Sequence, residues 1–579
     1  MLQLFIDNEQ VDLLPDASIT IDEESPVFEK DTIPGGYSYP FSLPITPRNR
    51  RILAFPERIE KQGAMSTEKP FQLFYDGQLR FSGTILITEA GTQYKANLMV
   101  GTGNLASRIK DVKLKDLDLG GERTWEWLAE YAYPDSDFAL FPVYNTKLYD
   151  GSPYSDRYIN NKYRLNSYES GVFYYAAGDA FAVSPFPFLG YIVRKIMSQY
   201  GFQIAGNCLE SNKDFRDLVI YSNYDITKAI TTIEMVETFV GTDQFGDEIT
   251  VLMPEITFIR ELNTFNLVDA LPDMLITDFL LSLRSLLNIA FVFDAQDHVW
   301  IMQRQDYVMR LMDRDITAQA IGIPQLLSAL STSGFKLTWE HDNDDLLFKN
   351  GFLKIEDVLD KIKDPVADTE ELAALTPDFN EIRLVVSLDA YYQFALNEET
   401  LTYKWTKWSI GYQNYLSGLM QETFETKFST LMMVTYQREV AGPLIRCPWT
   451  EQVGNSIEQK DYKAFSPRLL FYRGMQLDSD NDPSPMGSSD NLDRIGTQLT
   501  GKNLCLKWEG EFGLYEQLWK NYLTWWMARK QVTWYIKDPS DLSFTKKYAI
   551  QGNHYLLKKR TVNLTQRGVE PGECEFYLV

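Results

Sequence analysis

The chain has 579 residues, of which 44% are hydrophobic and 14% aromatic, and it carries a formal net charge of −24 at pH 7. This composition is sufficient for several packed cores and excludes a wholly disordered protein, and the acidic balance argues against adhesive binding to DNA or RNA, because such binding depends on lysine and arginine side chains that neutralise phosphates. The charge leaves two interpretations open, namely an acidic wall that DNA slides past without sticking, or an acidic protein whose charge serves no electrostatic task.

The first element predicted from the residues alone is a three-strand antiparallel meander over residues 71–100. Asp76-Gly77 stands between two alternating runs, which is the strongest short-range signal of a hairpin, because a type I′ turn requires positive φ at both central residues. Gly83 is expected to mark a bulge or bend, and Gly91 marks the second turn. Asn104 is positioned to cap a short helix that follows.

Residues 116–184 are rich in Tyr, Asn, Asp, Gly and Pro, and we expect short strands and long ordered loops in a surface or inter-subunit insertion. A short helix is predicted within 125–131. Two helix-then-strand units follow. In the first, Gly201 supplies the left-handed stop between a helix and a strand at 202–204.

In the second unit, Thr277 or Asp278 is expected to cap the start of the helix. Asn288 is expected to end it in the left-handed conformation, as Gly201 does in the first unit. Strands are predicted over 289–293 and 298–302. The two helix-then-strand units look like an internal repeat, which we call the internal echo. Their spacing along the sequence is too long for the repeats of a solenoid.

Farther along, residues 361–378 form a polar linker with one helical turn, and a strand-rich region extends to about residue 477. The segment 478–491 is the best candidate for a mobile loop, because it consists largely of Asp, Ser, Pro and Gly. An amphipathic helix is predicted over 514–530. Antiparallel strands with a Gly552-Asn553 turn then close the chain.

The order of hairpin, Phe81-Ser82-Gly83, strand and capped helix resembles the first domain of baseplate hub proteins of tailed phages, which is built like the tail-tube subunit. The runs at 2–13, 18–28 and 39–53 are similar to the first strands of such a hub, with Leu43–Asn49 as an irregular edge. The helix, hairpin and terminal strand after residue 511 resemble the closing half of a tube-like barrel.

This resemblance implies an α+β, mainly β fold with two tail-tube-like β-barrel domains and inserted helix–strand and loop-rich domains. We expect residues 1–115 to form the first barrel and 116–330 the inserted α+β part with its loop-rich segment. Residues 331–510 would be strand-rich, as part of the second barrel or as a peripheral domain. Residues 511–579 would close the second barrel.

The resemblance further implies a structural protein rather than an enzyme: the hub of a phage baseplate or tail tip. Such hubs are homotrimers whose paired barrels form a pseudo-hexameric ring. The expected partners are other copies, the tail tube or distal tail protein, the spike or tip protein and the tape-measure protein, with DNA only in transit. The expected location is the virion, after assembly in the host cytoplasm. The alternatives are a carbohydrate-binding tail adhesin and a cell-wall-degrading tail protein.

No catalytic, cofactor-binding or metal-binding residue is predicted. The chain has three histidines, His298, His341 and His554, too far apart in sequence to favour a triad or a zinc site. The run Gly101–Ala106, with Asp118 beyond it, matches a dinucleotide-binding pattern in form. The preceding strand alternates like a half-exposed antiparallel strand, which argues against that reading.

Two further patterns have competing interpretations. Asp478, Asp480 and Asp482 begin like a calcium loop, but Pro483 stands where glycine is needed and Ser489 where a glutamate is needed, so an EF-hand is excluded and a weak cation contact remains. The second pattern is aromatic and consists of Tyr403, Trp405 and Trp408, of which Tyr403 and Trp405 would share one face of a strand. They are suited to sugar stacking, but core or interface packing explains them as well.

The four cysteines, Cys208, Cys447, Cys505 and Cys574, lack C-x-x-C spacing and are expected to be buried and unpaired. The first ten residues lack a basic stretch, so no signal peptide is expected. The most apolar span, 271–293, contains three charged residues, so no membrane segment is expected.

Overall fold

The computed structural model of the chain is mainly β. It describes residues 1–28, 35–64, 67–101, 105, 108–124, 131–145, 164–169, 172–173, 182–242, 248–262, 264–294, 299–305, 310, 313–327, 334–340, 345, 361–388, 390–397, 401–408, 414–418, 422–437, 444–452, 455–456 and 466–579.

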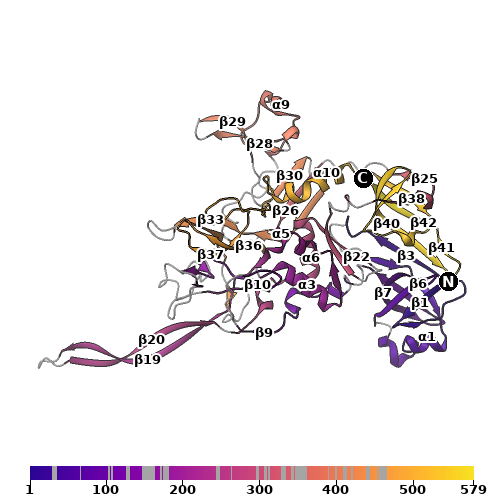
Figure 1. Cartoon of the computed structure of the whole chain (residues 1–579), viewed down its shortest axis with the longest axis horizontal. Helices are drawn as coiled ribbons and strands as arrows, with labels where there is room; N and C mark the ends of the chain where they lie inside the picture. Colours follow the sequence, from indigo (N-terminus) through magenta and orange to yellow (C-terminus); the bar gives the residue numbers. More distant parts are fainter. Residues whose placement is uncertain are drawn as a thin grey trace.

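The largest element is a 15-stranded sheet, in which 13 strands come from the two ends of the chain and two, β24 and β25, from its middle (Figure 1). The indigo N-terminal strands and the yellow C-terminal strands lie side by side in it. Its main path runs through β2 (Glu9–Gln10), β1 (Leu2–Ile6), β6 (Lys69–Tyr75), β7 (Gln78–Ala90), β8 (Gln93–Val100), β4 (Gly36–Ser38), β3 (Ser18–Glu24), β40 (Asn553–Thr565), β42 (Gly572–Leu578), β38 (Gln531–Ile536) and β25 (Ala320–Leu326). Off this path lie β5 (Phe41–Pro44), β24 (Asp313–Asp315), β39 (Lys547–Ile550) and β41 (Val569–Glu570).

The predicted meander is confirmed as β6, β7 and β8 in antiparallel register. Asp76 and Gly77 both have positive φ (48° and 74°), as a type I′ turn requires. The bulge expected at Gly83 is wrong. Gly83 is paired on both sides, and a Cβ there would lie 1.9 Å from the Met99 carbonyl oxygen, so glycine is needed for close approach of two backbones. The register shifts lie elsewhere, between Leu73 and Phe74 of β6 and between Ile87 and Glu89 of β7.

The irregular edge expected over Leu43–Asn49 is also wrong in part. Strand β5 pairs with β8 from Phe41 to Pro44. The helix α1 (Pro47–Ile52) follows, because the Thr46 side chain accepts from the backbone N–H of Asn49 and Pro47 has the φ that a first helical turn needs.

One strand belongs to two hydrophobic cores. Val562 and Leu564 of β40 pack with the N-terminal strands, in a core that includes Leu4, Leu73 and Leu98. Tyr555 and Leu557, earlier on the same strand, pack in a second core with the C-terminal strands. Because β40 is continuous, the two halves of the sheet are joined by backbone as well as by side chains.

Two helix-then-strand units form the centre of the molecule. The helix α3 (Leu189–Gln199) precedes β16 (Gln203–Ala205), and α6 (Ile276–Leu287) precedes β22 (Ile289–Asp294). The expected left-handed stops are confirmed, with φ of 78° at Gly201 and 51° at Asn288. The expected cap at Thr277 or Asp278 is wrong: the N-cap of α6 is Leu275, whose side chain caps nothing.

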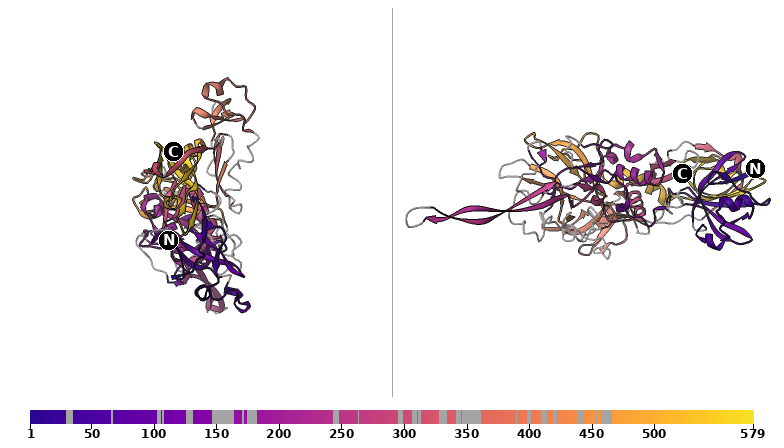
Figure 2. Two further views of the ribbon diagram at one scale, coloured as in Figure 1. Left: turned by 90° about the vertical axis from the view of Figure 1, so that its right-hand side faces the viewer. Right: turned by 90° about the horizontal axis from the view of Figure 1, so that it is seen from below.

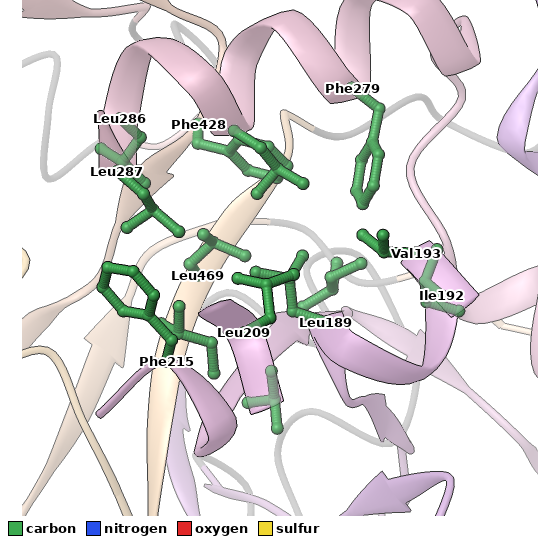
Figure 3. Close-up of a cluster of buried hydrophobic side chains, with 14 of the residues drawn as sticks. Leu189, Ile192, Val193, Leu209, Phe215, Phe279, Leu286, Leu287, Phe428 and Leu469 are labelled. Carbon is green, nitrogen blue, oxygen red and sulfur yellow. The ribbon is translucent and has the colours of Figure 1, made fainter. Parts of the chain in front are cut away.

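The two units meet in one sheet and one core. Strands β16 and β22 both pair with β23 (Val299–Arg304), β16 in parallel and β22 antiparallel. Figure 3 shows Phe279, Leu286 and Leu287 of α6 facing Leu189 and Val193 of α3 across a buried cluster. The predicted internal echo therefore corresponds to two units with a common partner strand.

Short strands and loops occupy the described part of 116–184, as the composition predicts. They are β9 (Glu122–Arg123), β10 (Phe138–Ala139), β11 (Val143–Asn145), β12 (Arg164–Leu165), β13 (Tyr168–Glu169) and β14 (Val172–Phe173). Most of the short helix predicted within 125–131 lies outside the described residues.

A small lobe stands apart from the body in Figures 1 and 2. It contains α9 (Thr369–Ala374), β27 (Ile382–Val385), β28 (Ala390–Asn397) and β29 (Thr402–Lys407). The linker predicted over 361–378 is wrong, because this segment is part of the lobe, whereas the helical turn expected within it is confirmed as α9. Ile362 and Val366 make bridges to β27, and Val366 packs against Leu372 and Val385.

The mobile loop predicted over 478–491 is wrong for most of its length. Strand β37 (Pro483–Ser488) pairs antiparallel with β36 (Arg468–Leu477), and residues 484–491 are buried. The small residues that suggested mobility allow close packing instead. A Cβ at Gly487 would lie 2.0 Å from the ring of Phe141.

The C-terminal helix is confirmed as η8 (Tyr515–Trp519), a π-helical turn, followed by α10 (Lys520–Ala528). Leu514, Leu518, Tyr522 and Trp526 are buried, as the amphipathic pattern predicts. The turn expected at Gly552-Asn553 lies one residue earlier, because Asn553 already pairs with Ile550 and the two positive φ angles belong to Gln551 and Gly552.

A long two-stranded arm, β19 (Thr227–Thr242) and β20 (Glu248–Leu262), leaves the body at the side away from the large sheet (Figures 1 and 2). No pattern in the sequence predicted this arm.

Candidate functional site

The junction between the two halves of the large sheet is the pairing of β3 with β40. Its register runs without a break from Ser18 opposite Thr565 to Glu24 opposite Lys559. Side chains join the same two strands: the Thr561 hydroxyl donates to Asp22 Oδ1 at 2.6 Å, and the Ser18 hydroxyl donates to Asn563 Oδ1 at 2.7 Å. The junction therefore holds the N-terminal and C-terminal strands as one rigid surface.

Arg560 is the central side chain of this junction, and it is buried. Its Nε donates to Glu23 Oε2 at 2.7 Å, and its Nη1 donates to the carbonyl oxygens of Pro539 and Ser540 at 3.0 and 3.3 Å. The guanidinium also lies 5.5 Å from the centroid of the Phe81 ring. One cation thus links β3, β7, β40 and the turn after β38, and its charge is matched by a carboxylate.

The sheet is open at both ends, and the end at β25 is apolar. Ile323 is 90% exposed and Leu326 is 74% exposed, and Ile321, Leu327 and Tyr535 beside them are also exposed. β25 pairs with β38 on one side only, with a register shift between Ile321 and Gln325. We call residues 320–327 the β25 edge. Within the described part of the chain no strand covers its outer side.

The opposite end of the sheet is polar. It is formed by the two-residue strand β2, whose Glu9 and Gln10 are exposed. The side chain of Arg51 pairs with Glu9 there. The two ends of the sheet therefore differ in chemistry. If the β25 end of one copy contacted the β2 end of another, the interface would join unlike surfaces. Interfaces of this kind form a closed ring when the rotation between successive subunits brings the last copy back to the first.

The histidines are not brought together. His554 lies on β40, and its Nδ1 is 2.9 Å from Asp313 Oδ2. His298 and His341 lie outside the described residues. In the described ranges no group of three or more His, Cys, Asp or Glu side chains is arranged to hold a metal ion.

The calcium-like run forms a turn. Asp478 Oδ1 accepts from the backbone N–H groups of Asp480 and Asp482, both at 2.9 Å. The carboxylate that would be the first ligand of a cation therefore stabilises the loop between β36 and β37.

The dinucleotide-like run follows an antiparallel strand. β8 pairs antiparallel with β7 and with β4, and Gly101 has a φ of 60° in the turn after it. A dinucleotide site requires a buried parallel strand before its glycines. The strand before Gly101 is antiparallel, so it does not meet this requirement. Asp118 Oδ1 accepts from the Gly120 N–H, and residues 102–104 and 106 lie outside the described ranges.

The three aromatic residues divide between two places. Tyr403 and Trp405 lie on β29 with the ring of Phe394 between them, at centroid distances of 6.0 and 5.5 Å. Trp405 packs against the lobe core, whereas Tyr403 is 54% exposed. Trp408 instead packs edge-on against Tyr391 and lines a cavity of about 800 Å³ between the lobe and the start of η8.

A buried arginine that no sequence pattern marks joins β36 to the body. The guanidinium of Arg473 donates to the carbonyl oxygens of Asp490 and Leu504 at 2.8 and 3.1 Å and lies 3.3 Å from Asp214 Oδ1. Burial lowers the pKa of Arg473, and the nearby carboxylates oppose that shift. Its partners come from distant segments, so only the fold brings them together.

None of the four cysteines forms a disulfide, and Cys208, Cys447 and Cys574 are buried as expected, whereas Cys505 is only half-buried. Burial raises the pKa of the Cys208 and Cys574 thiols to about 12 and that of Cys505 to about 11. These thiols are therefore protonated at neutral pH and poorly suited to nucleophilic chemistry.

No helix within the described ranges is both long and apolar enough to cross a membrane. No family model and no curated protein matches the sequence. Among solved structures, the chain is similar to the 43 kDa tail protein of prophage MuSo2 from Shewanella oneidensis. That similarity covers 100% of this chain and 98% of the other, with a TM-score of 0.30 and 7% sequence identity.

Proposed function

We propose that the chain is a structural hub of a phage tail, in which three copies form a ring around the channel for DNA and tape-measure protein. The observation that carries this proposal is the large sheet, in which strands from both ends of the chain form two adjacent cores with β40 in common. In the proposed trimer, two halves per subunit give six units in all. That number matches a sixfold tube on one side and a threefold spike or tip on the other.

The two open ends of the sheet support a ring rather than an isolated subunit. An exposed apolar edge strand is a site for association, and natural proteins normally blunt or cover such strands. The β25 edge has an isoleucine and a leucine among its most exposed residues. In the proposed ring a neighbouring copy covers this edge.

The acidic charge supports a channel that conducts DNA without holding it. With a net charge of −24, the subunit repels phosphates on average. The purified protein should not retard DNA in a low-salt gel, and tight, salt-sensitive binding would contradict this part of the proposal. In the same proposal the chain is not an enzyme, and it contacts the tail tube or distal tail protein and the spike or tip.

The test of the ring is a pair of substitutions at the β25 edge, Ile323→Lys and Leu326→Lys, with Leu401→Lys as the matched control. Leu401 is 77% exposed on the small lobe, so all three changes place a lysine in water. Native mass spectrometry should find trimers for the wild type and the control, and monomers for the two edge variants with unchanged Tm. A wild-type protein that is monomeric in solution and in tails would overturn the proposal.

A carbohydrate-binding adhesin is the second candidate. Phe379 is 64% exposed, and its ring packs edge-on against Tyr403 at 5.7 Å, so the lobe presents an aromatic surface of the kind that stacks on sugars. An adhesin should bind host cells as isolated protein and lose that binding in Tyr403→Ala. A hub should not bind cells in either form.

A further inference from the structure

A cavity of about 800 Å³ lies between the small lobe and the body of the molecule. Lobe residues at the start of β28 and the end of β29 form one part of its wall, and β30 (Asn414–Gly418), the segment 507–511 and the first residues of η8 form the rest. Figure 1 shows β28 and β29 in the lobe, with β30 and α10 at the adjacent side of the body. The volume is within the range of about 300–1,000 Å³ that is usual for ligand sites, and such sites often lie where two parts of a protein meet.

Two partly exposed aromatic side chains line this cavity, and a buried ring supports each of them. Trp408 packs edge-on against the buried Tyr391 at a centroid distance of 6.3 Å, and the Trp408 N–H donates to the Tyr391 carbonyl oxygen at 2.8 Å. Tyr415 stacks on the buried Tyr515, with ring planes inclined by 19° and centroids 4.0 Å apart. Because the buried neighbours limit the movement of the outer rings, the cavity has aromatic surfaces that are in position before a ligand enters.

The charged side chains that line the cavity balance one another. Among the described residues they are three lysines and three glutamates, a net charge of 0 (3 − 3), in a chain whose net charge is −24. They are Lys407, Lys507, Lys520, Glu509, Glu511 and Glu516. Glu516 and Lys520 also pair with each other at 2.9 Å. The cavity therefore combines ammonium donors with carboxylate acceptors and has no surplus of either charge.

This balance argues against two classes of ligand. A nucleic acid or another polyanion binds through a surplus of lysine and arginine side chains, which the cavity lacks. A purely apolar ligand would remove charged groups from water without giving them a hydrogen-bond partner, which costs free energy. The ligand that fits has an apolar face for the aromatic rings and polar groups around its edge.

Saccharides and proline-rich peptides both have apolar surfaces that pack on tyrosine and tryptophan rings, but they differ in their hydrogen bonds. Every hydroxyl group of a saccharide can both donate and accept, so a saccharide satisfies lysine and glutamate side chains alike. Proline has no N–H, so a proline-rich segment gives no donor to carboxylates such as those of Glu509 and Glu511. The chemistry of the lining therefore favours a saccharide.

We infer that the cavity binds a neutral oligosaccharide, with one sugar ring stacked on Trp408, a further contact at Tyr415, and hydroxyl groups hydrogen-bonded to the surrounding lysines and glutamates. The site lies within one copy of the chain, so it does not depend on the proposed ring. Each hydroxyl group exchanges a hydrogen bond to water for one to the protein, so the dissociation constant is expected to be about 1 mM. Binding of this strength does not hold an isolated protein on a cell surface, so it is compatible with the proposed hub.

The test is saturation-transfer NMR on the full-length protein with neutral tetrasaccharides of glucose, N-acetylglucosamine, galactose and mannose. A heparin tetrasaccharide and decaproline are the comparison ligands. At least one neutral tetrasaccharide should bind with a dissociation constant of about 1 mM or below, and neither comparison ligand should bind. Failure of every neutral tetrasaccharide to bind, or equal binding of heparin or decaproline, would overturn the inference.

Three variants locate the bound saccharide. Trp408→Ala removes the stacking surface, and Ala390→Phe adds a ring to the cavity lining while Trp408 is retained. Tyr403→Ala is the matched control, because Tyr403 is exposed on β29 and does not line the cavity. The dissociation constant should rise at least about tenfold in both cavity variants and stay within about twofold in the control.

The Ala390→Phe variant decides the outcome if Trp408→Ala unfolds the lobe. Unchanged binding in the cavity variants, or binding that only Tyr403→Ala abolishes, would overturn the inference. Native mass spectrometry of the same protein separates the site from the ring. A trimer that binds no saccharide would refute the site and retain the ring, and a monomer that binds one would do the reverse.

Discussion

Arg560 Nε lies 2.7 Å from Glu23 Oε2, although the two residues are 537 positions apart in the sequence. Both side chains are nearly buried. The pair crosses the junction of β3 and β40, so the ion pair and the continuous register hold the same two strands.

We predict that Arg560→Met strongly destabilises the protein. The substitution leaves the Glu23 carboxylate and the carbonyl oxygens of Pro539 and Ser540 without their cationic donor in a buried place. Breaking a buried pair from one side costs about 3–5 kcal/mol, and differential scanning fluorimetry should show Tm falling by several degrees. Glu23→Gln, which keeps an acceptor for Arg560, should lower Tm less. An Arg560→Met protein with wild-type Tm would show that the junction is held by its backbone alone.

The C-terminal strand β42 is predicted to be essential for folding. It lies between β40 and β38, and Cys574 and Phe576 are fully buried on it, while Tyr577 packs on the other face against Phe28 and Trp526. Burying each large side chain contributes about 1.5–3 kcal/mol. Deletion of residues 572–579 should therefore abolish soluble expression.

The control for that deletion is Glu575→Gln. Glu575 is partly exposed and accepts from Gln531 Nε2 and Lys558 Nζ, and a surface ion pair contributes about 0–1 kcal/mol. The glutamine variant should express normally. A soluble, assembled protein that lacks 572–579 would show that β42 is an appendage.

Gly487→Ala should destabilise the region around β37. The new methyl group would meet the ring of Phe141, which is fully buried and packs against Phe186 and Tyr472, so the ring has no free space to move into. Overpacking of this kind costs about 1–3 kcal/mol, and thermolysin should cleave the variant faster than the wild type.

Gly91→Ala is the matched control for that substitution, because a Cβ at Gly91 meets nothing within 4 Å. Its rate of cleavage should equal that of the wild type. Equal rates for the two variants would mean that the packing of β37 against Phe141 is loose.

The buried thiols predict a defined response to alkaline pH. The pKa values of Cys574 and Cys505, about 12 and 11, lie above the ordinary 9.0, so the native state holds these protons more tightly than the unfolded state. Their contribution to stability is full below pH 9 and is lost as the pH rises towards 11 and 12. Iodoacetamide at pH 8 should label the native protein slowly and the urea-unfolded protein at all four cysteines. Mass spectrometry should find Cys505 labelled first as the pH rises. Rapid labelling of Cys574 at pH 8 would contradict its burial.

Local signals in the sequence predicted local structure well. The turn predicted at Asp76-Gly77 and the helix end predicted at Asn288 are correct, because each depends on the φ angles of only one or two residues. The cap of α6 could not be found, since Leu275 makes no side-chain hydrogen bond. The prediction of a mobile loop over 478–491 failed, because small residues are equally suited to a solvated turn and to a tight contact such as that of Gly487 with Phe141.

The proposed assembly surfaces were harder to predict. The pairing of β3 with β40 could not be predicted from either segment. The alternation of apolar and polar residues shows which face of a strand is buried, but it does not show which strand lies next to it. Ile323 and Leu326 belong to an apolar run that usually indicates a buried strand, and only the topology shows that this strand is last in its sheet.

The sequence separation of β3 and β40 also determines how the protein must be made. A ribosome that adds roughly 5–20 residues per second finishes β3 about 30–110 s before it reaches Arg560. During that time the open side of β3 emerges from every ribosome on the same message, and the unfinished N-terminal halves can pair with one another. We therefore expect the nascent chain to need a chaperone that shields β3 until its last strands are synthesised.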